Sequence, residues 1–479
     1  MVNFANIYYL EVKFMPTIKK MIFAEKSDPA LDFYEKRIHF VGIGGVSMAS
    51  LAKLAILAGA RVSGSDRDLG ERTHQLATMG AHIYAGHSRE NVSEDMQLIV
   101  YSGAISEDTP ELVRARELGI PAVTRASFLG GIMSEYSTRI GISGTHGKST
   151  VTAMLDAIFT LAGKNPTTLA GEDLPKTNSS LRVGGKENLI YEACEYKDAF
   201  KMFSPTIAVA LNMEMDHVDY YKDEKSLKAA FVAALSKASD FALINEDDEN
   251  LFRIKKKITT RLLTFGANES ADYTYSIISF ADLGYTFSLK RKGRTLGIFK
   301  IPMIGAFNVV NACAAVIVAL ECGVDAKVIA EALRGFDGIK RRLEVVGTHH
   351  GRTVIYDYAH HPTEIRASIN TVKMAYPGEV TVIFKPHTYS RTQYFWREFR
   401  GALELADYIL LSDIYPAREN PIEGVTSENL ARAIGARAIY ANDHDIIGAT
   451  DLHTYGTIIV MGAGDMEEIK DRLIRSDEE

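Results

Sequence analysis

Residues 140–150 read IGISGTHGKST and carry the residue types of a phosphate-binding loop. Lys148 offers a positive charge to β- and γ-phosphates, and the hydroxyl of Ser149 can bind Mg²⁺. Gly144 and Gly147 leave backbone N–H donors open to an anion. An isoleucine stands where the GxxxxGK[ST] pattern has its first glycine, so the spacing departs from that pattern. The segment still predicts a nucleoside triphosphate site.

Two further segments offer the carboxylate and imidazole groups that a phosphate site needs for its metal ions. YEACEYKD contains Glu192 and Glu195, and LNMEMDHVDYY contains Asp216 and His217. Each follows an apolar run typical of a buried strand, at the edge where α/β sheets bind ligands. Surface carboxylates are common and a single histidine is often structural, so each segment alone has a non-functional alternative. The two segments together favour a phosphate site that uses bound metal ions.

Ionisable side chains gather in two segments of the last third of the chain. They are Asp357, His360 and His361 in DYAHHPTEI, and Lys385, His387 and Arg391 in FKPHTYSRT. These residue types suit a cationic cluster that faces a carboxylate or a phosphoryl group. The alternative is a zinc site, against which stands the lack of further His or Cys spacing to complete a tetrahedral set.

A glycine turn near the start of the chain predicts a second anion site. GIGG at residues 42–45 lies between an expected strand and an expected helix, where backbone can approach a diphosphate closely. Ser47 occupies the last position of the G-x-G-x-x-G dinucleotide fingerprint, so NAD is not the natural ligand. A tight turn with a purely structural role is the alternative.

The composition is that of an ordinary soluble globular protein. The 479 residues contain 54 Lys+Arg and 61 Asp+Glu, a formal charge of −7 that argues against nucleic acid as a partner. Three cysteines, with no CxxC pair among them, favour a reducing compartment, so we expect a cytoplasmic protein. We find no signal peptide and no apolar run of the roughly 20 residues that a bilayer needs, and expect no membrane insertion.

The elements that must position these residues form three α/β units. A βαβ pattern begins at Arg37, and a new strand at residues 138–142 feeds the phosphate loop and a helix. Residues 272–301 alternate like antiparallel strands, which predicts a mixed central sheet. Beyond Arg342, apolar runs recur every 20 to 30 residues, as in a doubly wound sheet.

We therefore expect three domains after an N-terminal extension. The extension is 1–36, to which we attach no function, and the domains are 37–137, 138–338 and 339–479. The first and last are expected to be Rossmann-like, and the central one resembles a P-loop ATPase with a mixed sheet.

The motifs together, in order and spacing, resemble those of the Mur ligase family. They are GxGGxSM, GTHGKST, EACEYKDAF, NMEMDHVDYY, GAFNVVNA, GIKRRLE, DYAHHPTEI and PHTYSRT, over about residues 37–465. Members of this family resemble one another in a compact GTxGK[ST]T loop, which Gly144 to Thr150 matches. The resemblance implies an ATP-dependent ligase with two Mg²⁺ ions.

The resemblance also implies roles for particular residues. The implied ATP contacts are Gly144, Thr145, His146, Gly147, Lys148, Ser149, Thr150, Asn308, Asn311 and Arg342. The implied magnesium ligands are Ser149 and Glu192 for one ion and His217 for the other. The implied sugar-nucleotide and amino-acid contacts are Gly44, Gly45, Ser65, Asp66, His87, Ser102, Arg125, Arg182, Tyr358, His360, His387 and Arg391. The implied catalytic set is Lys148, Glu192, His217, His360 and Arg391.

Three features depart from the family's usual pattern. Phe307 and Thr388 stand where many relatives carry His and Arg, and residues 171–180 lack a glycine-rich sugar-site loop. The closest resemblance is to members that join L-alanine to the lactyl carboxylate of UDP-N-acetylmuramate through an acyl phosphate, as a monomer or homodimer. The alternatives are a ligase that attaches a whole tripeptide to the same sugar nucleotide, and a non-catalytic nucleotide-sensing relative.

Overall fold

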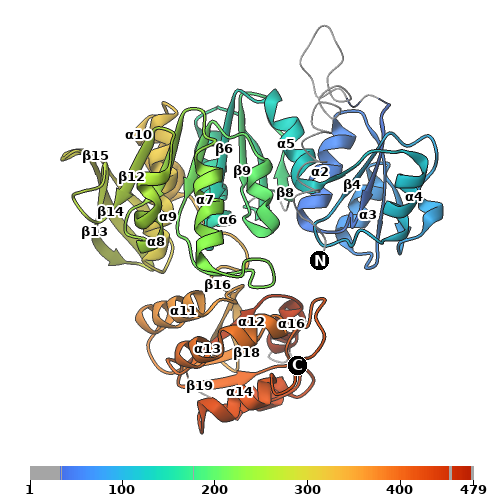
Figure 1. The fold of residues 1–479 in the computed structure, drawn as a ribbon. Helices are drawn as coiled ribbons and strands as arrows, with labels where there is room; N and C mark the ends of the chain where they lie inside the picture. Colours follow the sequence, from blue (N-terminus) through green and yellow to red (C-terminus); the bar gives the residue numbers. More distant parts are fainter. Residues whose placement is uncertain (1–32, 34, 176, 178, 453–455, 476–479) are drawn as a thin grey trace.

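The protein is described here from a computed structural model, which places residues 33, 35–175, 177, 179–452 and 456–475. Nearly all of the expected extension, 1–36, therefore lies outside the described residues. Three separate β-sheets follow one another along the chain, each with helices packed on it (Figure 1). Within the described ranges no helix is long and apolar enough to span a bilayer.

The first sheet has the strand order and direction expected of a Rossmann-like unit. Its five parallel strands are β3 (His82–Ala85), β2 (Arg61–Asp66), β1 (Arg37–Val41), β4 (Leu98–Tyr101) and β5 (Ala122–Thr124), in spatial order. Its helices are α2 (Val46–Leu57), α3 (Glu71–Thr78), α4 (Pro110–Leu118) and α5 (Arg125–Ile132). Gly64 permits close packing in β2, because a Cβ there would lie 2.5 Å from Ile43 Cδ1.

The second sheet is mixed, as the alternating pattern at 272–301 predicts. Its ten strands in spatial order are β15 (Arg294–Ile301), β14 (Gly284–Arg291), β13 (Tyr273–Ala281), β12 (Leu262–Gly266), β11 (Phe241–Asn245), β10 (Ile207–Ala210), β6 (Thr138–Ser143), β9 (Asn188–Glu192), β7 (Thr167–Leu174) and β8 (Ser179–Arg182). The pairs β13–β14, β14–β15 and β7–β8 are antiparallel, and the rest are parallel.

Helices cover both faces of the second sheet. One face packs on α6 (Lys148–Leu161), α9 (Phe307–Glu321) and α10 (Ala326–Arg334), and the other on α7 (Glu224–Leu235) and α8 (Glu249–Ile254). The apolar run of α9 is fully buried, from Ala312 to Ala319, which explains why this segment is apolar on all sides.

The third sheet lies in the lower part of Figure 1, beyond the loops at one end of the second sheet's strands. Its strands in spatial order are β16 (Glu344–His349), β17 (Arg352–Asp357), β21 (Thr457–Gly462), β18 (Val380–Lys385), β19 (Tyr408–Leu411) and β20 (Ala438–Tyr440). All pairs are parallel except β16 with β17. Its helices are α11 (Pro362–Ala375), α12 (Tyr389–Tyr394), α13 (Trp396–Leu403), α14 (Ser427–Ile434), α15 (Ile446–Thr450) and α16 (Met466–Arg475).

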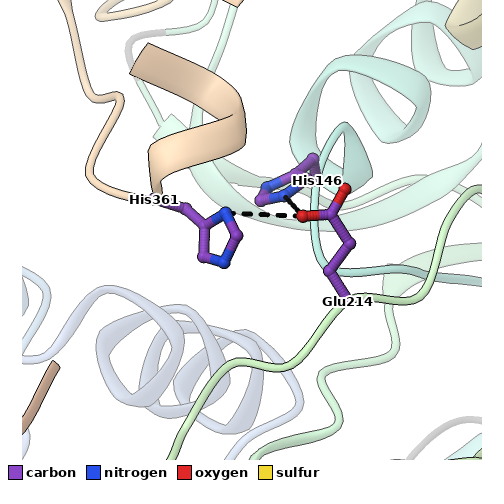
Figure 2. A group of neighbouring side chains, drawn as sticks. All are labelled: His146, Glu214 and His361. Carbon is purple, nitrogen blue, oxygen red and sulfur yellow. Dashed lines mark ion pairs between the residues drawn. The ribbon is translucent and has the colours of Figure 1, made fainter. Parts of the chain in front are cut away.

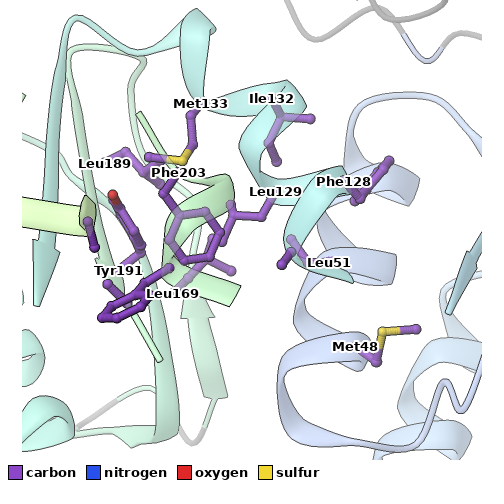
Figure 3. Close-up of a cluster of buried hydrophobic side chains, with 14 of the residues drawn as sticks. Met48, Leu51, Phe128, Leu129, Ile132, Met133, Leu169, Leu189, Tyr191 and Phe203 are labelled. Atoms are coloured by element: carbon purple, nitrogen blue, oxygen red, sulfur yellow. The ribbon is translucent and has the colours of Figure 1, made fainter. Parts of the chain in front are cut away.

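The first two sheets share one continuous apolar core. Leu51 of α2 and Leu129 of α5 belong to the same buried cluster as Leu169 of β7 and Tyr191 of β9 (Figure 3). The third sheet has apolar clusters of its own, which only a few half-buried side chains of the central unit contact. The third unit is therefore joined to the rest mainly through polar contacts.

Candidate active site

The phosphate loop runs from the end of β6 to the start of α6, as predicted. Gly144 and Gly147 have φ of +138° and +85°, which favour glycine. A Cβ on Gly147 would lie 2.4 Å from Oδ1 of Asn311, so the loop and α9 require this small residue. The loop is tied to the segment after β10, because the N–H of His146 donates to Oδ1 of Asn212 at 2.8 Å. Its amides at the start of α6 form an anion site.

Lys148 lies at the centre of this loop with its ammonium group held by carbonyl and carboxylate oxygens. Its Nζ donates to the carbonyls of Gly144 and Thr145 and lies 3.3 Å from Oε2 of Glu195. Burial lowers the pKa of Lys148, but nearby carboxylates, Glu195 first among them, raise it above its ordinary value. The side chain is therefore a permanent positive charge at the loop.

The predicted magnesium ligands lie around Lys148. Glu192, the last residue of β9, accepts from the N–H of Gly171 and from the hydroxyl of Ser149. Burial raises the pKa of the Glu192 carboxyl, which those hydrogen bonds oppose. His217 Nε2 lies 3.9 Å from Oε1 of Glu195. This set of oxygen and nitrogen donors suits a divalent cation.

His217 has φ of +51°, in the left-handed region, and its ring lies 4.6 Å from that of Tyr196 between centroids. Burial lowers the pKa of His217. A hydrogen bond to Cys194 and the carboxylates of Asp216 and Glu195 outweigh this effect and raise the pKa to about 9.

A chain of buried and half-buried polar side chains connects this centre to the third unit. Arg391 Nη2 lies 2.6 Å from Oδ1 of Asp216, and Nη1 lies 2.9 Å from Nδ1 of His387. The rings of His387 and His360 are 6.1 Å apart between centroids. Burial disfavours the charge of Asp216, but Arg391 holds the pKa of this carboxyl well below its ordinary range.

The two histidines of this chain are neutral near pH 7. Burial lowers the pKa of His360 to about 4, and burial and Arg391 lower that of His387 to about 3. His360 Nδ1 lies 2.9 Å from the carbonyl of Tyr358, which only accepts, so this nitrogen carries the proton. The remaining nitrogen, Nε2, is then a hydrogen-bond acceptor.

One residue of the predicted cationic cluster lies elsewhere. Lys385, at the end of β18, pairs with Asp443 and lies 2.8 Å from Oδ1 of Asp465, within the third unit. The grouping of Lys385 with His387 and Arg391 is therefore wrong, because Lys385 is the last residue of the buried strand β18 and not part of the loop that follows it.

Two cavities border this centre, and a third shares lining residues with one of them. The first, about 260 Å³, lies between the phosphate loop and the third unit. Its lining includes Asn308, Asn311 and Arg342, which the structure thus brings together with His146, Gly147, Ser149 and Thr150. Phe307, the departure from the family pattern, also lines it.

The second cavity, about 330 Å³, joins the first two units. Gly45, Ser102 and Arg125 line it from the first unit, and Lys148 and Glu192 from the second. The predicted sugar-nucleotide residues and the predicted phosphate residues therefore face each other across one space.

The third cavity, about 1100 Å³, opens over the carboxyl edge of the first sheet and reaches all three units. Gly44, Gly45, Asp66, His87 and Ser102 line it. Ser65 does not, since it is fully buried; it lies behind His87, with its Oγ 3.0 Å from Nδ1 of that ring.

Arg182 is the predicted sugar-site residue that the structure places apart from these cavities. Its Nε lies 2.8 Å from Oδ1 of Asp156 on α6, and only neighbours of Arg182, such as Ser180 and Leu181, line the large cavity.

Sequence reasoning missed two carboxylates that bind the third unit to the loop. Glu364 Oε1 lies 3.0 Å from Nδ1 of His146, and Glu214 Oε2 lies 2.6 Å from Oγ1 of Thr363. Burial lowers the pKa of His146, but the carboxylates of Glu364 and Glu214 raise it to about 9, above its ordinary value. Glu364 had a sequence signal, because it stands three residues after His361 in a capping box at the start of α11.

Three family models match successive parts of the chain. The Mur ligase family catalytic domain matches residues 37–137, the Mur ligase middle domain 142–319, and the Mur ligase glutamate ligase domain 341–464.

Similar proteins match along nearly the whole chain. A UDP-N-acetylmuramate--L-alanine ligase from Clostridium novyi (strain NT) is 38% identical over 451 residues, which are 92% of this chain and 98% of that protein. One of the same name from Caldicellulosiruptor bescii is 39% identical over 445 residues, 91% of this chain and 98% of that protein.

Solved structures agree. UDP-N-acetylmuramate-alanine ligase from Thermotoga maritima matches with a TM-score of 0.78 at 26% identity, covering 92% of this chain and 99% of that one. A murein peptide ligase from Psychrobacter arcticus shares the fold, with a TM-score of 0.70 at 24% identity over 92% of this chain and 98% of that one. The chain belongs to the Mur ligase family.

Proposed function

We propose that the protein is an ATP-dependent ligase that joins L-alanine to the lactyl carboxylate of UDP-N-acetylmuramate, a step of peptidoglycan precursor synthesis. The names of the relatives that match over 91–92% of the chain support this activity. The observation that carries it is the 330 Å³ cavity, because Gly45 and Arg125 of the first unit there face Lys148 and Glu192 of the second. A carboxylate and a phosphoryl donor can meet in such a space.

The three sheets would then be the cores of three domains, 37–137, 138–338 and 339–479. The sugar nucleotide would occupy the 1100 Å³ cavity, with Gly44 and Gly45 near its diphosphate. ATP would occupy the 260 Å³ cavity, with its phosphates on the glycine loop and Asn308, Asn311 and Arg342 around its base. The loop fits phosphates because its glycines have no Cβ and α6 begins at Lys148.

Magnesium fits the donor set at the loop. Ser149 and Glu192 would hold one ion and His217 a second, and bound Mg²⁺ would offset negative charge on the phosphates. The Ser149 hydroxyl interacts with the Glu192 carboxyl and opposes the rise of its pKa, so the two residues would offer oxygens to the same ion. Glu195, which pairs with Lys148, would release that ammonium to the nucleotide.

In the first step an oxygen of the lactyl carboxylate forms a bond to the γ-phosphorus of ATP, and the bond to the β-phosphate oxygen breaks. The products are an acyl phosphate and ADP. Two anions must approach each other, so the positive charge of Lys148 stabilises the transition state, in which negative charge is shared among phosphate oxygens. Arg125 lines the same cavity and would orient the carboxylate.

In the second step the uncharged amine of L-alanine attacks the acyl carbon, and inorganic phosphate leaves as the amide forms. His360 is neutral, so its Nε2 can accept the amine proton, and Arg391 and His387 would orient the amino-acid carboxylate and the phosphoryl group. Tyr358, whose ring lies 5.3 Å from that of His360, would fix the imidazole. Closure of the third unit over the site would exclude water, which otherwise hydrolyses an acyl phosphate.

The test is phosphate release from ATP with UDP-N-acetylmuramate and one acceptor at a time: L-alanine, glycine, L-serine or the tripeptide. We expect release that requires both the sugar nucleotide and L-alanine. Release with the sugar nucleotide only when the tripeptide is the acceptor would assign the chain to the tripeptide-attaching alternative. No release with any acceptor would assign it to the nucleotide-sensing alternative.

A further inference from the structure

A group of three potential metal ligands lies outside the proposed magnesium site, where the second and third units meet. His146 comes from the phosphate loop, Glu214 from the segment after β10, and His361 from the residue that caps α11 (Figure 2). Oε2 of Glu214 lies 3.7 Å from Nε2 of His146 and 3.5 Å from Nδ1 of His361. The three ligand atoms all lie within 4.8 Å of one another.

A hydrogen bond behind each imidazole leaves the other ring nitrogen facing this shared point. Nδ1 of His146 lies 3.0 Å from the carboxylate of Glu364, so Nδ1 keeps its proton, and a cation beside Glu214 would take the place of the second proton, on Nε2. Nε2 of His361 lies 3.2 Å from the carbonyl of Met215, so its Nδ1 carries the lone pair. This lone pair accepts a long hydrogen bond, 3.3 Å, from the N–H of Thr363, which a cation would replace. A carboxylate or a carbonyl behind a ligating histidine is the usual outer support of a metal site.

The Nε2 atom of His146 adds an independent observation. It is buried and has no hydrogen-bond partner among the described residues, although it lies next to the Glu214 carboxylate. His361 is itself only 4% exposed. A buried imidazole nitrogen without a hydrogen bond is costly unless a proton or a cation completes it.

The spacing fits a tetrahedral ion. Zinc bonds of about 2.0 to 2.2 Å to nitrogen and oxygen place neighbouring ligand atoms roughly 3.4 Å apart. The two distances from Glu214, 3.5 and 3.7 Å, are close to that value. Two imidazoles and one carboxylate are a donor set that zinc and similar divalent ions accept with a fourth position left to water.

We propose that His146, Glu214 and His361 form a site for a zinc-like divalent cation that links the phosphate loop to the third unit. Because the ligands come from both sides of the interface, the ion holds the third unit against the loop. This site is distinct from the proposed magnesium site, for which Ser149, Glu192 and His217 would supply the ligands.

The structure also explains why the zinc interpretation of the sequence lacked ligands. The segment DYAHHPTEI supplies only His361, since the side chain of its neighbour His360 lies with Tyr358 and His387. The other two ligands come from positions 215 and 147 residues earlier in the chain, which no local spacing can reveal.

The experiment is metal binding to the full chain, stripped with a chelator and kept in excess Mg²⁺. We expect Co²⁺ to give the visible absorption of a four-coordinate site, and Zn²⁺ to abolish it at one equivalent per chain. Glu214→Gln and His361→Asn should each remove the signal. Glu364→Gln keeps all three ligands and an oxygen for the helix cap but removes the charge behind His146, and should weaken zinc affinity by about 10- to 100-fold.

Two matched controls separate this site from others. His217→Ala removes a proposed magnesium ligand, and His350→Asn alters a second group of potential ligands, His349, His350 and Asp451. Both should keep the cobalt signal, and circular dichroism should show every variant folded. The proposal is overturned if no saturable zinc binding occurs, in which case a proton on His146 completes the group as an ion pair. It is also overturned if the signal survives in folded Glu214→Gln and His361→Asn chains, or is lost in either control.

Discussion

The ammonium group of Lys148 is held at the glycine loop by two loop carbonyls and by Glu195. Replacing Lys148 with alanine removes one preorganised charge from the transition state of phosphoryl transfer. We expect kcat to fall by about 10²- to 10³-fold, measured as phosphate release with saturating substrates. Lys327→Ala, an exposed lysine on α10, is the matched control and should leave kcat unchanged. Full turnover by the Lys148→Ala enzyme would rule out the role of the loop lysine.

Asp357 gives a prediction about pH. Burial raises the pKa of its carboxyl to about 6, against hydrogen bonding from Ser368. An acid whose pKa is higher in the folded state loses stability as it ionises, so the cost is absent below about pH 4 and complete above about pH 6. Asp357→Asn should therefore stabilise the protein at pH 8 more than at pH 4.5.

The difference between the two pH values should be on the order of 1 to 3 kcal/mol, which is the size of such a pKa shift. Thermal unfolding of the wild type and of Asp357→Asn at both pH values measures it. An equal change in Tm at pH 4.5 and pH 8 would show that Asp357 titrates normally in the folded chain.

The glycines at the two ends of α6 distinguish the effect of backbone strain on ATP binding from the effect of a steric clash. Gly147 has φ of +85° and lies against Asn311. Gly163 has φ of +70°, and a Cβ added there would have no atom within 4 Å. Alanine at either position costs about 1 kcal/mol in strain. Only Gly147→Ala also displaces the loop, so we expect at least tenfold weaker ATP binding from that variant and unchanged binding from Gly163→Ala. Calorimetry can measure both. Equal affinities would mean that the loop geometry is unimportant for the nucleotide.

Sequence patterns predicted most buried strands closely but missed the half-exposed edge strand β16. β4 and β19 begin and end where their apolar runs do, because a strand buried on both faces is a continuous apolar segment. β16 was missed: it is an edge strand, paired antiparallel on one side only, and its exposed Val345 and left-handed Gly347 break the pattern.

The candidate site was predictable where its residues lie next to strand ends in the sequence. Lys148, Glu192 and His217 follow three neighbouring parallel strands, so sheet geometry alone brings them together. The contacts Asp216–Arg391 and His146–Glu364 join positions 175 and 218 residues apart. They depend on how the third unit packs against the second, which leaves no local signal in the chain.

At the scale of the whole molecule, the two interfaces of the central unit differ in kind. The first unit shares a continuous apolar core with it, whereas the third is held by buried polar pairs such as Asp216 with Arg391. Polar interfaces between domains allow relative motion, and large apolar ones restrict it. We therefore expect the third unit to open and close over the site while the first two move as one body.

Two variants test this difference. Asp216→Asn leaves the Arg391 guanidinium buried without its carboxylate, and should increase the radius of gyration measured by solution X-ray scattering. Leu129→Ala opens a cavity in the shared core, and should lower stability by about 2 to 5 kcal/mol at unchanged radius of gyration. An unchanged radius for Asp216→Asn would show that other contacts keep the third unit closed.

The most direct test of the central claim follows oxygen atoms through the reaction. UDP-N-acetylmuramate labelled with ¹⁸O in its lactyl carboxylate is incubated with ATP, Mg²⁺, L-alanine and the enzyme, and both products are analysed by mass spectrometry. If the carboxylate attacks the γ-phosphorus, each phosphate released with an alanyl product carries one ¹⁸O from that carboxylate. Phosphate free of ¹⁸O, or no alanyl product, would contradict amide formation through an acyl phosphate.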